Sequence, residues 1–199
     1  MISAMPNAVG TEFLPTASFL FRGMLLAGLG TLMACAVIDG APLSDAQQAM
    51  VDLTFGPSDF AVTGHLDHPD GRYRIGEPIG LTVQVSKPAS VAVLEVLPNG
   101  ATTLIFPNRR HPETPLTADT PVAIPGAATR IVAGASGSII LKVIASERSG
   151  SWLFTRKPDS DSDFSALGTS SRAIAKDISL SLKGGGTATT VLMVRVEGS

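Results

Sequence analysis

The sequence predicts a single, mainly β domain built as a sandwich, with one short helix near its start. From residue 79 onward, apolar residues alternate with polar ones or gather in short runs typical of strands. The 14 prolines and 20 glycines are spread widely, which favours many turns over long helices. Several short strands separated by closely spaced turn signals are typical of an immunoglobulin-like or related sandwich.

The one helix is expected over residues 44–53. Ser44 and Gln47 have the spacing of a capping box, in which the two side chains satisfy each other's backbone N–H groups. The apolar residues that follow recur at helical spacing, namely Ala46, Ala49, Met50 and Leu53.

The first half of the predicted sandwich is a meander of three strands. Apolar residues alternate with polar ones over 79–86, which predicts a strand with one buried face. Residues 91–97 are apolar at nearly every position, so this strand is expected to be buried more fully. Pro98-Asn99-Gly100 supplies turn chemistry before a third strand over 102–106.

The second half is less regular. A polar loop over 107–119 precedes short strands at 121–124 and 129–132, and an apolar strand at 138–145. Residues 158–163 are expected to form an acidic loop. One or two helical turns are expected near 170–176. The alternation at 178–182, the glycines at 184–186 and the apolar run at 191–196 predict a C-terminal hairpin.

The only cysteine, Cys35, ends an apolar stretch that begins two residues after Arg22, and Ala34 precedes it. This order resembles the lipobox of a bacterial lipoprotein, and the apolar stretch is about half the ~20 residues needed to span a bilayer. It predicts a cleaved signal peptide over 1–34, with translation starting at Met1 or at a later methionine. A lipidated N-terminus, tether and helix over 35–57 and the sandwich over 58–199 would follow. The alternative is an ordinary buried cysteine in an apolar helix.

The resemblance implies a palmitate-bearing Cys35 that anchors the protein in the cell envelope. Ala36 follows the cysteine in place of the aspartate typical of inner-membrane retention, which indicates the outer membrane, facing the periplasm or the surface. With one cysteine, the chain forms no internal disulfide. A formal net charge of -2 argues against nucleic acid as a partner.

Several segments in the middle of the chain resemble the bacterial family called domain of unknown function 4384. They are Tyr73–Ile79, Val93–Gly100, Thr103–Asn108, Ile124-Pro125 and Gly137–Ala145. The most specific of them is Ile105-Phe106-Pro107-Asn108, where the family usually has leucine at the first position. The resemblance covers roughly residues 72–148 and implies an extracytoplasmic or appended β-sandwich module. It implies no activity, and it carries over no functional residues.

Two groups of residues have the chemistry of metal ligands, but turn formation and solvent exposure explain both better. His65, His68 and Asp70, with His111 elsewhere, lie near a Pro69-Asp70-Gly71 turn. Asp159, Asp161 and Asp163 alternate like calcium ligands, but the glycine and glutamate of a calcium loop are missing. We therefore expect neither a metal nor another cofactor.

The candidate residues for binding a partner are Trp152, Phe154, Arg109 and Arg110. Trp152-Leu153-Phe154 is a cluster of large apolar residues, which is expected to be buried and would be an aromatic hot spot if exposed. Arg109-Arg110 is a small basic spot that would suit an acidic partner.

The favoured function is that of a non-catalytic binding or scaffold component of the cell envelope, with a protein partner there. An accessory subunit of a secretion or surface assembly is one form of it. The alternatives are a hydrolase acting on the cell wall or a glycan, and a small-ligand carrier. No clustered acid–base or metal motif supports the hydrolase, and a 5% aromatic content argues against a carrier that stacks sugars.

Replacing Cys35 with serine is expected to abolish acylation and release the protein from membranes, because the thiol is the only site for the lipid. Mass spectrometry of the N-terminal peptide and membrane fractionation measure the two effects. Unchanged membrane association of the variant would contradict the lipid anchor.

Overall fold

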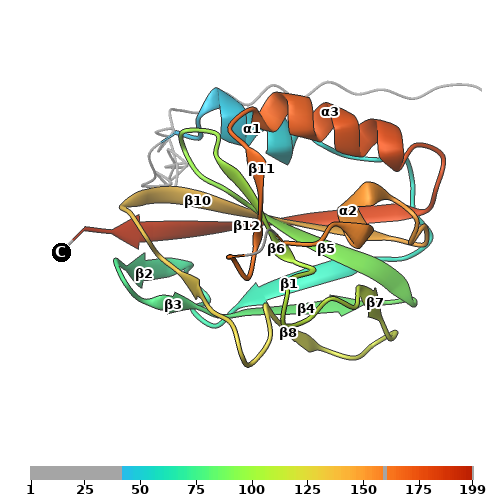
Figure 1. Cartoon of the computed structure of the whole chain (residues 1–199), viewed down its shortest axis with the longest axis horizontal. Helices are drawn as coiled ribbons and strands as arrows, with labels where there is room; N and C mark the ends of the chain where they lie inside the picture. Colours follow the sequence, from blue (N-terminus) through green and yellow to red (C-terminus); the bar gives the residue numbers. More distant parts are fainter. Residues whose placement is uncertain (1–41, 159–160, 199) are drawn as a thin grey trace, which may run out of the picture. The chain divides into compact units, whose positions relative to one another are not determined.

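The computed structural model describes residues 42–158 and 161–198 (Figure 1). The predicted signal peptide over 1–34 and the lipidation site Cys35 lie outside these ranges. Within them, no helix combines the length and the apolar character that crossing a bilayer requires.

The described chain forms three helices and twelve strands. The helices are α1 (Asp45–Val51), α2 (Trp152–Thr155) and α3 (Ser171–Ser181). The strands are β1 (Val62–Leu66), β2 (Arg72–Arg74), β3 (Pro78–Ile79), β4 (Leu81–Val85), β5 (Ala89–Val96), β6 (Thr102–Phe106), β7 (Pro115–Leu116), β8 (Val122–Ile124), β9 (Ile131–Val132), β10 (Gly137–Ser146), β11 (Ser165–Gly168) and β12 (Thr187–Glu197).

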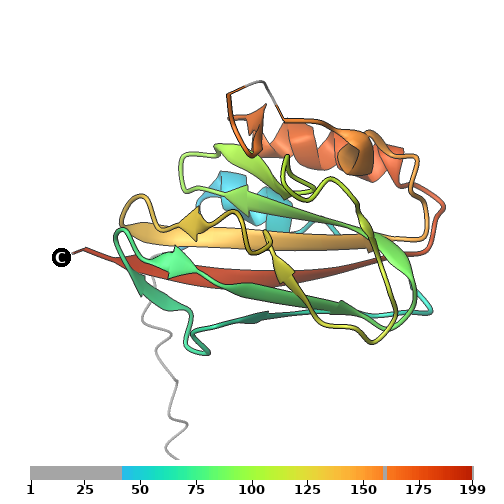
Figure 2. The ribbon, with the colours of Figure 1, turned by 60° about the horizontal axis from the view of Figure 1, so that its bottom comes forward.

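These elements make the mainly β sandwich that the sequence predicts, with a layer of helices added to one side. The large sheet has the order β11-β6-β5-β10-β12-β2, and β7 pairs with β5. The small sheet, β1-β4-β8, faces one side of the large sheet, and the helices cover the other side (Figure 1). Strand β12 runs beside β10 along its whole length (Figure 2), while its pairing with β2 is parallel.

The central strands β5 and β10 are buried on both faces. Alternate side chains of β10, such as Ile139 and Leu141, enter the core between the two sheets, while Ile140 and Ile144 enter the core beneath the helices. The side-chain period of a strand is two, so a strand buried on both faces must be apolar nearly throughout. This confirms the expectation of a more fully buried strand over 91–97.

Helix α1 is fixed to the large sheet by two buried polar side chains. The capping box is present, and the Gln47 amide also donates to the backbone oxygens of Val96 at 3.2 Å and Ser138 at 2.6 Å. At the other end of the helix, Lys142 Nζ on β10 donates to the Leu53 backbone oxygen at 2.6 Å. A cation there satisfies carbonyls that have no partner within the helix. The helix expected over 44–53 is therefore confirmed.

The predicted C-terminal hairpin is wrong in its first arm, because residues 178–181 belong to α3 rather than to a strand. Ile174, Ile178 and Leu182 are spaced by four residues and form a buried stripe against the large sheet. The alternation of Ile178, Leu180 and Leu182 fits a strand equally well, but Leu180 is 63% exposed. The second arm, 191–196, is a strand within β12, and it pairs with β10.

Four strands, β1, β2, β7 and β11, were not predicted from the sequence. Strand β1 contains Gly64, where an added Cβ would lie 2.7 Å from Leu192 Cδ1, so the glycine allows β1 to approach β12 closely. Strand β2 is only three residues long. The strand expected over 79–86 is also interrupted at Gly80, between β3 and β4. The short strands expected near 121–124 and 129–132 are confirmed as β8 and β9.

Replacing Lys142 with methionine is expected to remove a pH dependence of the free energy of unfolding. Burial lowers the pKa of Lys142 to about 8 from its usual 10.5, against the attraction of the Asp52 carboxylate. Between these two pH values, Lys142 is protonated in the unfolded chain and neutral in the folded chain. Its contribution to the free energy of unfolding therefore rises with pH. The difference amounts to about 3 kcal/mol across that window.

Urea unfolding at several pH values from about 7 to 10 measures this effect. The stability of the wild type should rise over that range relative to Lys142→Met. The same substitution at the exposed Lys176 should leave the pH profile of the wild type unchanged. A gap between wild type and Lys142→Met that stays constant with pH would contradict the prediction.

Candidate functional site

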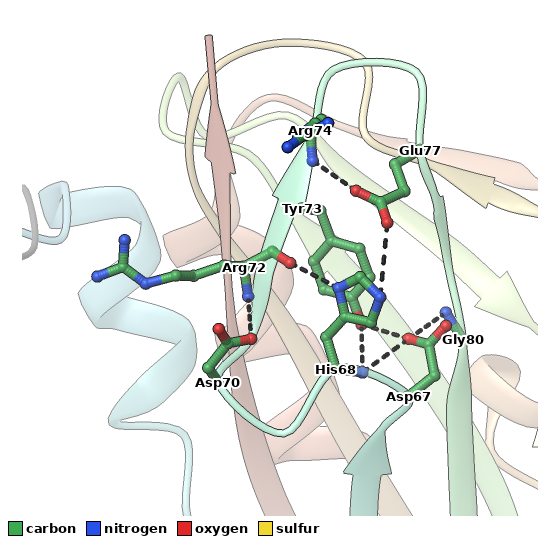
Figure 3. Close-up of polar contacts among 8 residues, drawn as sticks. All are labelled: Asp67, His68, Asp70, Arg72, Tyr73, Arg74, Glu77 and Gly80. Carbon is green, nitrogen blue, oxygen red and sulfur yellow. Dashed lines mark hydrogen bonds and ion pairs between the residues drawn. The ribbon is translucent and has the colours of Figure 1, made fainter. Parts of the chain in front are cut away.

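The densest group of ionisable side chains lies in the connection between β1 and β4 (Figure 3). The segment leaves the small sheet after Leu66, crosses to the large sheet as β2, and returns to the small sheet at Leu81. It contains Asp67, His68, Asp70, Arg72, Tyr73, Arg74 and Glu77. The polar contacts of this segment therefore join the two layers of the sandwich at one corner.

Asp67 is at the centre of the group. One of its carboxylate oxygens accepts hydrogen bonds from Tyr73 Oη at 2.5 Å, Gly80 N at 3.0 Å and His68 N at 3.2 Å. Desolvation pushes the pKa of Asp67 upward, but these hydrogen bonds and the nearby His68 outweigh it and hold the pKa below its usual range. The carboxylate is thus ionised, and it links strands of both sheets.

Tyr73 supplies the strongest of these links. Its side chain is 1% exposed, and its backbone lies opposite Val196 in the parallel pair of β2 and β12. Burial, and then the hydrogen bond to Asp67, raise the pKa of the Tyr73 phenol well above its ordinary value. The hydroxyl therefore remains protonated and acts as a fixed donor.

His68 covers the Tyr73 ring on the outer side. The two rings stack with centroids 4.5 Å apart and planes 6° from parallel. The His68 Nδ1 atom lies 2.7 Å from the Arg72 backbone oxygen, so Nδ1 carries the proton and donates it, and Nε2 faces Glu77 Oε1 at 3.5 Å. The Arg72 carbonyl and then Glu77 raise the pKa of His68, against some desolvation.

A recess of about 540 Å³ opens beside this group, lined by His68, Arg72, Tyr73, Arg74, Ile75, Glu77 and Glu197. Two pairs of charges lie along its rim: Arg72 Nη1 lies 2.5 Å from Glu197 Oε1, and His68 faces Glu77. Glu77 also accepts the Arg74 N–H at 2.8 Å, which closes the turn between them. The lining therefore offers polar groups to a ligand. Its acidic and basic side chains also hold the loop in place through their contacts with one another.

The histidines and carboxylates that resembled metal ligands are not brought together. His65 lies on β1 and His68 on the loop that follows, while the His111 ring meets the Phe106 ring edge-on at 5.1 Å. Across residues 42–158 and 161–198, no three His, Cys, Asp or Glu side chains are grouped as metal ligands. Asp159 of the calcium-like pattern lies outside the described residues.

Asp163, at the end of the acidic loop, is engaged with protein groups. Its carboxylate accepts from Arg110 Nε at 3.3 Å and from Thr129 Oγ1 at 3.5 Å. Its backbone oxygen accepts the Arg109 N–H at 3.0 Å. These contacts tie the basic spot of the sequence to the acidic loop.

The apolar cluster of Trp152, Leu153 and Phe154 forms most of α2 and packs into the core between the helices and the large sheet. Leu153 is fully buried, Phe154 is 4% exposed and Trp152 is half-buried. The expectation of burial is therefore confirmed for Phe154, and its ring is part of the core rather than a protruding hot spot. Arg109 and Arg110, in contrast, are both exposed.

The Ile105-Phe106-Pro107-Asn108 motif fixes the end of β6 and the start of the loop that follows. Phe106 is fully buried at the end of β6. The buried Asn108 amide donates to the backbone oxygens of Ile105 at 3.0 Å and Pro125 at 2.9 Å. Its side-chain oxygen accepts the N–H groups of Arg110 and His111. One side chain thus shapes the start of the 107–119 loop.

Residues 72–149 match the model of a protein family described as domain of unknown function 4384. The match begins at β2 and ends just after β10, and it confirms the resemblance expected from the motifs of Tyr73–Ile79 and Ile105–Asn108. It spans 78 of the 199 residues, and α1, β1, α2, β11, α3 and β12 lie outside it. No curated protein and no solved structure matches the chain.

Replacing Tyr73 with phenylalanine is expected to lower the free energy of unfolding by about 1–2 kcal/mol at neutral pH, because the Asp67 carboxylate loses its closest donor. The pKa of Asp67 should rise towards its usual value. A carboxyl whose pKa is lowered on folding stabilises the fold above its unfolded pKa and loses that effect as pH falls. The difference in free energy of unfolding between the wild type and Tyr73→Phe should therefore shrink as the pH falls to about 3.

Urea unfolding and NMR titration of Asp67 measure both effects. Glu77→Gln is the matched control, because it alters the same loop and leaves the bond between Tyr73 and Asp67 in place. An unchanged pKa of Asp67 in Tyr73→Phe would show that the hydrogen bond does not control this carboxylate.

Proposed function

We propose that this chain is a lipid-anchored component of the cell envelope that acts as a non-catalytic binding protein or scaffold, for example as an accessory subunit of a secretion or surface assembly. One observation carries the proposal: the densest group of ionisable residues stabilises a loop of the protein itself. The Asp67 carboxylate, the Tyr73 phenol and the His68 ring hold a loop between two sheets.

The chemistry of this loop favours binding over hydrolysis. A general acid or base must reach the proton of a bound substrate, and it works best with a pKa near the operating pH. Tyr73 is buried with a raised pKa, and Asp67 is ionised and accepts three hydrogen bonds. His68 directs one ring nitrogen to a backbone oxygen and the other to Glu77. These groups give the corner rigidity, which suits a surface that must hold its shape for a partner.

The proposed anchor and the docked helix would together keep the domain close to the membrane. The eight residues from 36 to 43 separate Cys35 from the N-cap Ser44, and fully extended they span about 28 Å. Helix α1 is held on the large sheet through Gln47 and Lys142. A lipid on Cys35 would therefore restrict the sandwich to a thin layer at the bilayer, where its effective concentration for a membrane partner is high.

Purification from native membranes in mild detergent tests the proposal. We expect a near-stoichiometric protein to accompany the wild type and to be lost with Cys35→Ser, because that variant is displaced from the layer where the partner resides. Tyr73→Phe provides a second comparison, in which the anchor remains and the loop is loosened. Repeated recovery of the acylated wild type alone would contradict the scaffold role, and hydrolysis of cell-wall fragments by the pure protein would overturn the non-catalytic assignment.

A further inference from the structure

A second recess lies between the loop that follows β6 and helix α2. Its volume is about 310 Å³, and it is lined by Asn108, Arg109, Pro112, Phe154, Thr155, Arg156, Lys157 and Pro158. Two segments far apart in the sequence meet there. The first begins with the Ile105–Asn108 motif, inside the family match, and the second lies beyond the end of the match.

Among the described residues that line this recess, Arg109, Arg156 and Lys157 are cationic and none is acidic. Arg156 directs one Nη towards the Ala166 backbone oxygen at 3.4 Å, which leaves most of the guanidinium's five N–H donors to face other groups. The recess beside His68 differs, because two acidic residues, Glu77 and Glu197, are among its lining. An arginine and a lysine side by side favour a carboxylate or phosphate group.

The remainder of the lining is apolar and held in place. The Phe154 ring belongs to the core beneath the helices, and Pro112 and Pro158 add rigid apolar surface. On the opposite side, the four hydrogen bonds of the buried Asn108 side chain fix the start of the loop. A recess with apolar walls and cationic residues in its lining has the composition of a small-molecule site, and its volume is at the small end of the usual range of roughly 300–1,000 Å³.

We propose that this recess binds a small organic anion, in which a phosphate or carboxylate group is joined to a compact apolar body. Arg156 and Lys157 contact the anionic group, and Phe154 with the two prolines contacts the apolar body. The site requires neither the lipid on Cys35 nor a protein partner. If no small anion binds, the proposed envelope function is unaffected. If the envelope function is wrong, the proposed anion site is likewise unaffected.

Phenyl phosphate is a suitable probe, because it joins the two chemistries in one small molecule. Titration calorimetry on the full chain in a non-ionic detergent should show saturable binding, tighter than that of inorganic phosphate and of benzyl alcohol, each of which carries one half of the probe. Trp152, the only tryptophan of the chain, lies on α2 and provides an independent fluorescence signal.

The double variant Arg156→Gln/Lys157→Gln should weaken binding of phenyl phosphate at least tenfold, or about 1.4 kcal/mol. Both side chains are exposed, so the fold should persist. The matched control is Arg172→Gln/Lys176→Gln, which removes two exposed cations from α3 and should keep the affinity of the wild type.

Three results would overturn the proposal. One is the absence of saturable binding of phenyl phosphate up to about 10 mM. Another is equal affinity for inorganic phosphate, which would indicate general attraction of anions. The third is an equal loss of affinity in the α3 control, which would indicate that net charge, rather than this recess, holds the probe.

Discussion

Burial of both faces of β5 and β10 is the constraint on which the rest of the structure depends. A strand that is apolar on both faces must pack against another layer on each face, because a single sheet cannot bury its own two faces. The small sheet covers one face, and the helices α1, α2 and α3 cover the other. The helical layer is therefore as necessary as the second sheet, although the helices are short and drawn from three separate parts of the chain.

The same arrangement explains why the two recesses differ. The connection from β1 to β4 leaves the small sheet, pairs with the edge of the large sheet as β2, and returns. Its carboxylates hold this connection in place through hydrogen bonds. The recess beside α2 lies where a helix of the outer layer meets a loop fixed from below by Asn108. Arg156 and Lys157, exposed just after that helix, are the cations that the proposed ligand would meet.

Local patterns in the sequence identified most of the elements but not their assembly. The capping box of Ser44 and Gln47 and the apolar run of β5 each specify one structure, and both were predicted. The apolar residues of 178–182 fit both the period of a strand and that of a helix, and only packing against the large sheet favours the helix. The contact of Asp67 with Tyr73 depends on β2 pairing with a strand more than a hundred residues later, which no local pattern encodes. The recess beside α2 depends likewise on segments about forty residues apart.

Strand β12 completes the large sheet, yet it follows all the other described helices and strands in the sequence. It lies between β10 and β2, and it brings Val194 and Val196 into the core between the sheets. Until these residues are available, one side of β10 has no partner and β2 has no neighbour. A nascent chain therefore cannot finish folding part by part from its N-terminus, because the sandwich closes only when synthesis has passed β12.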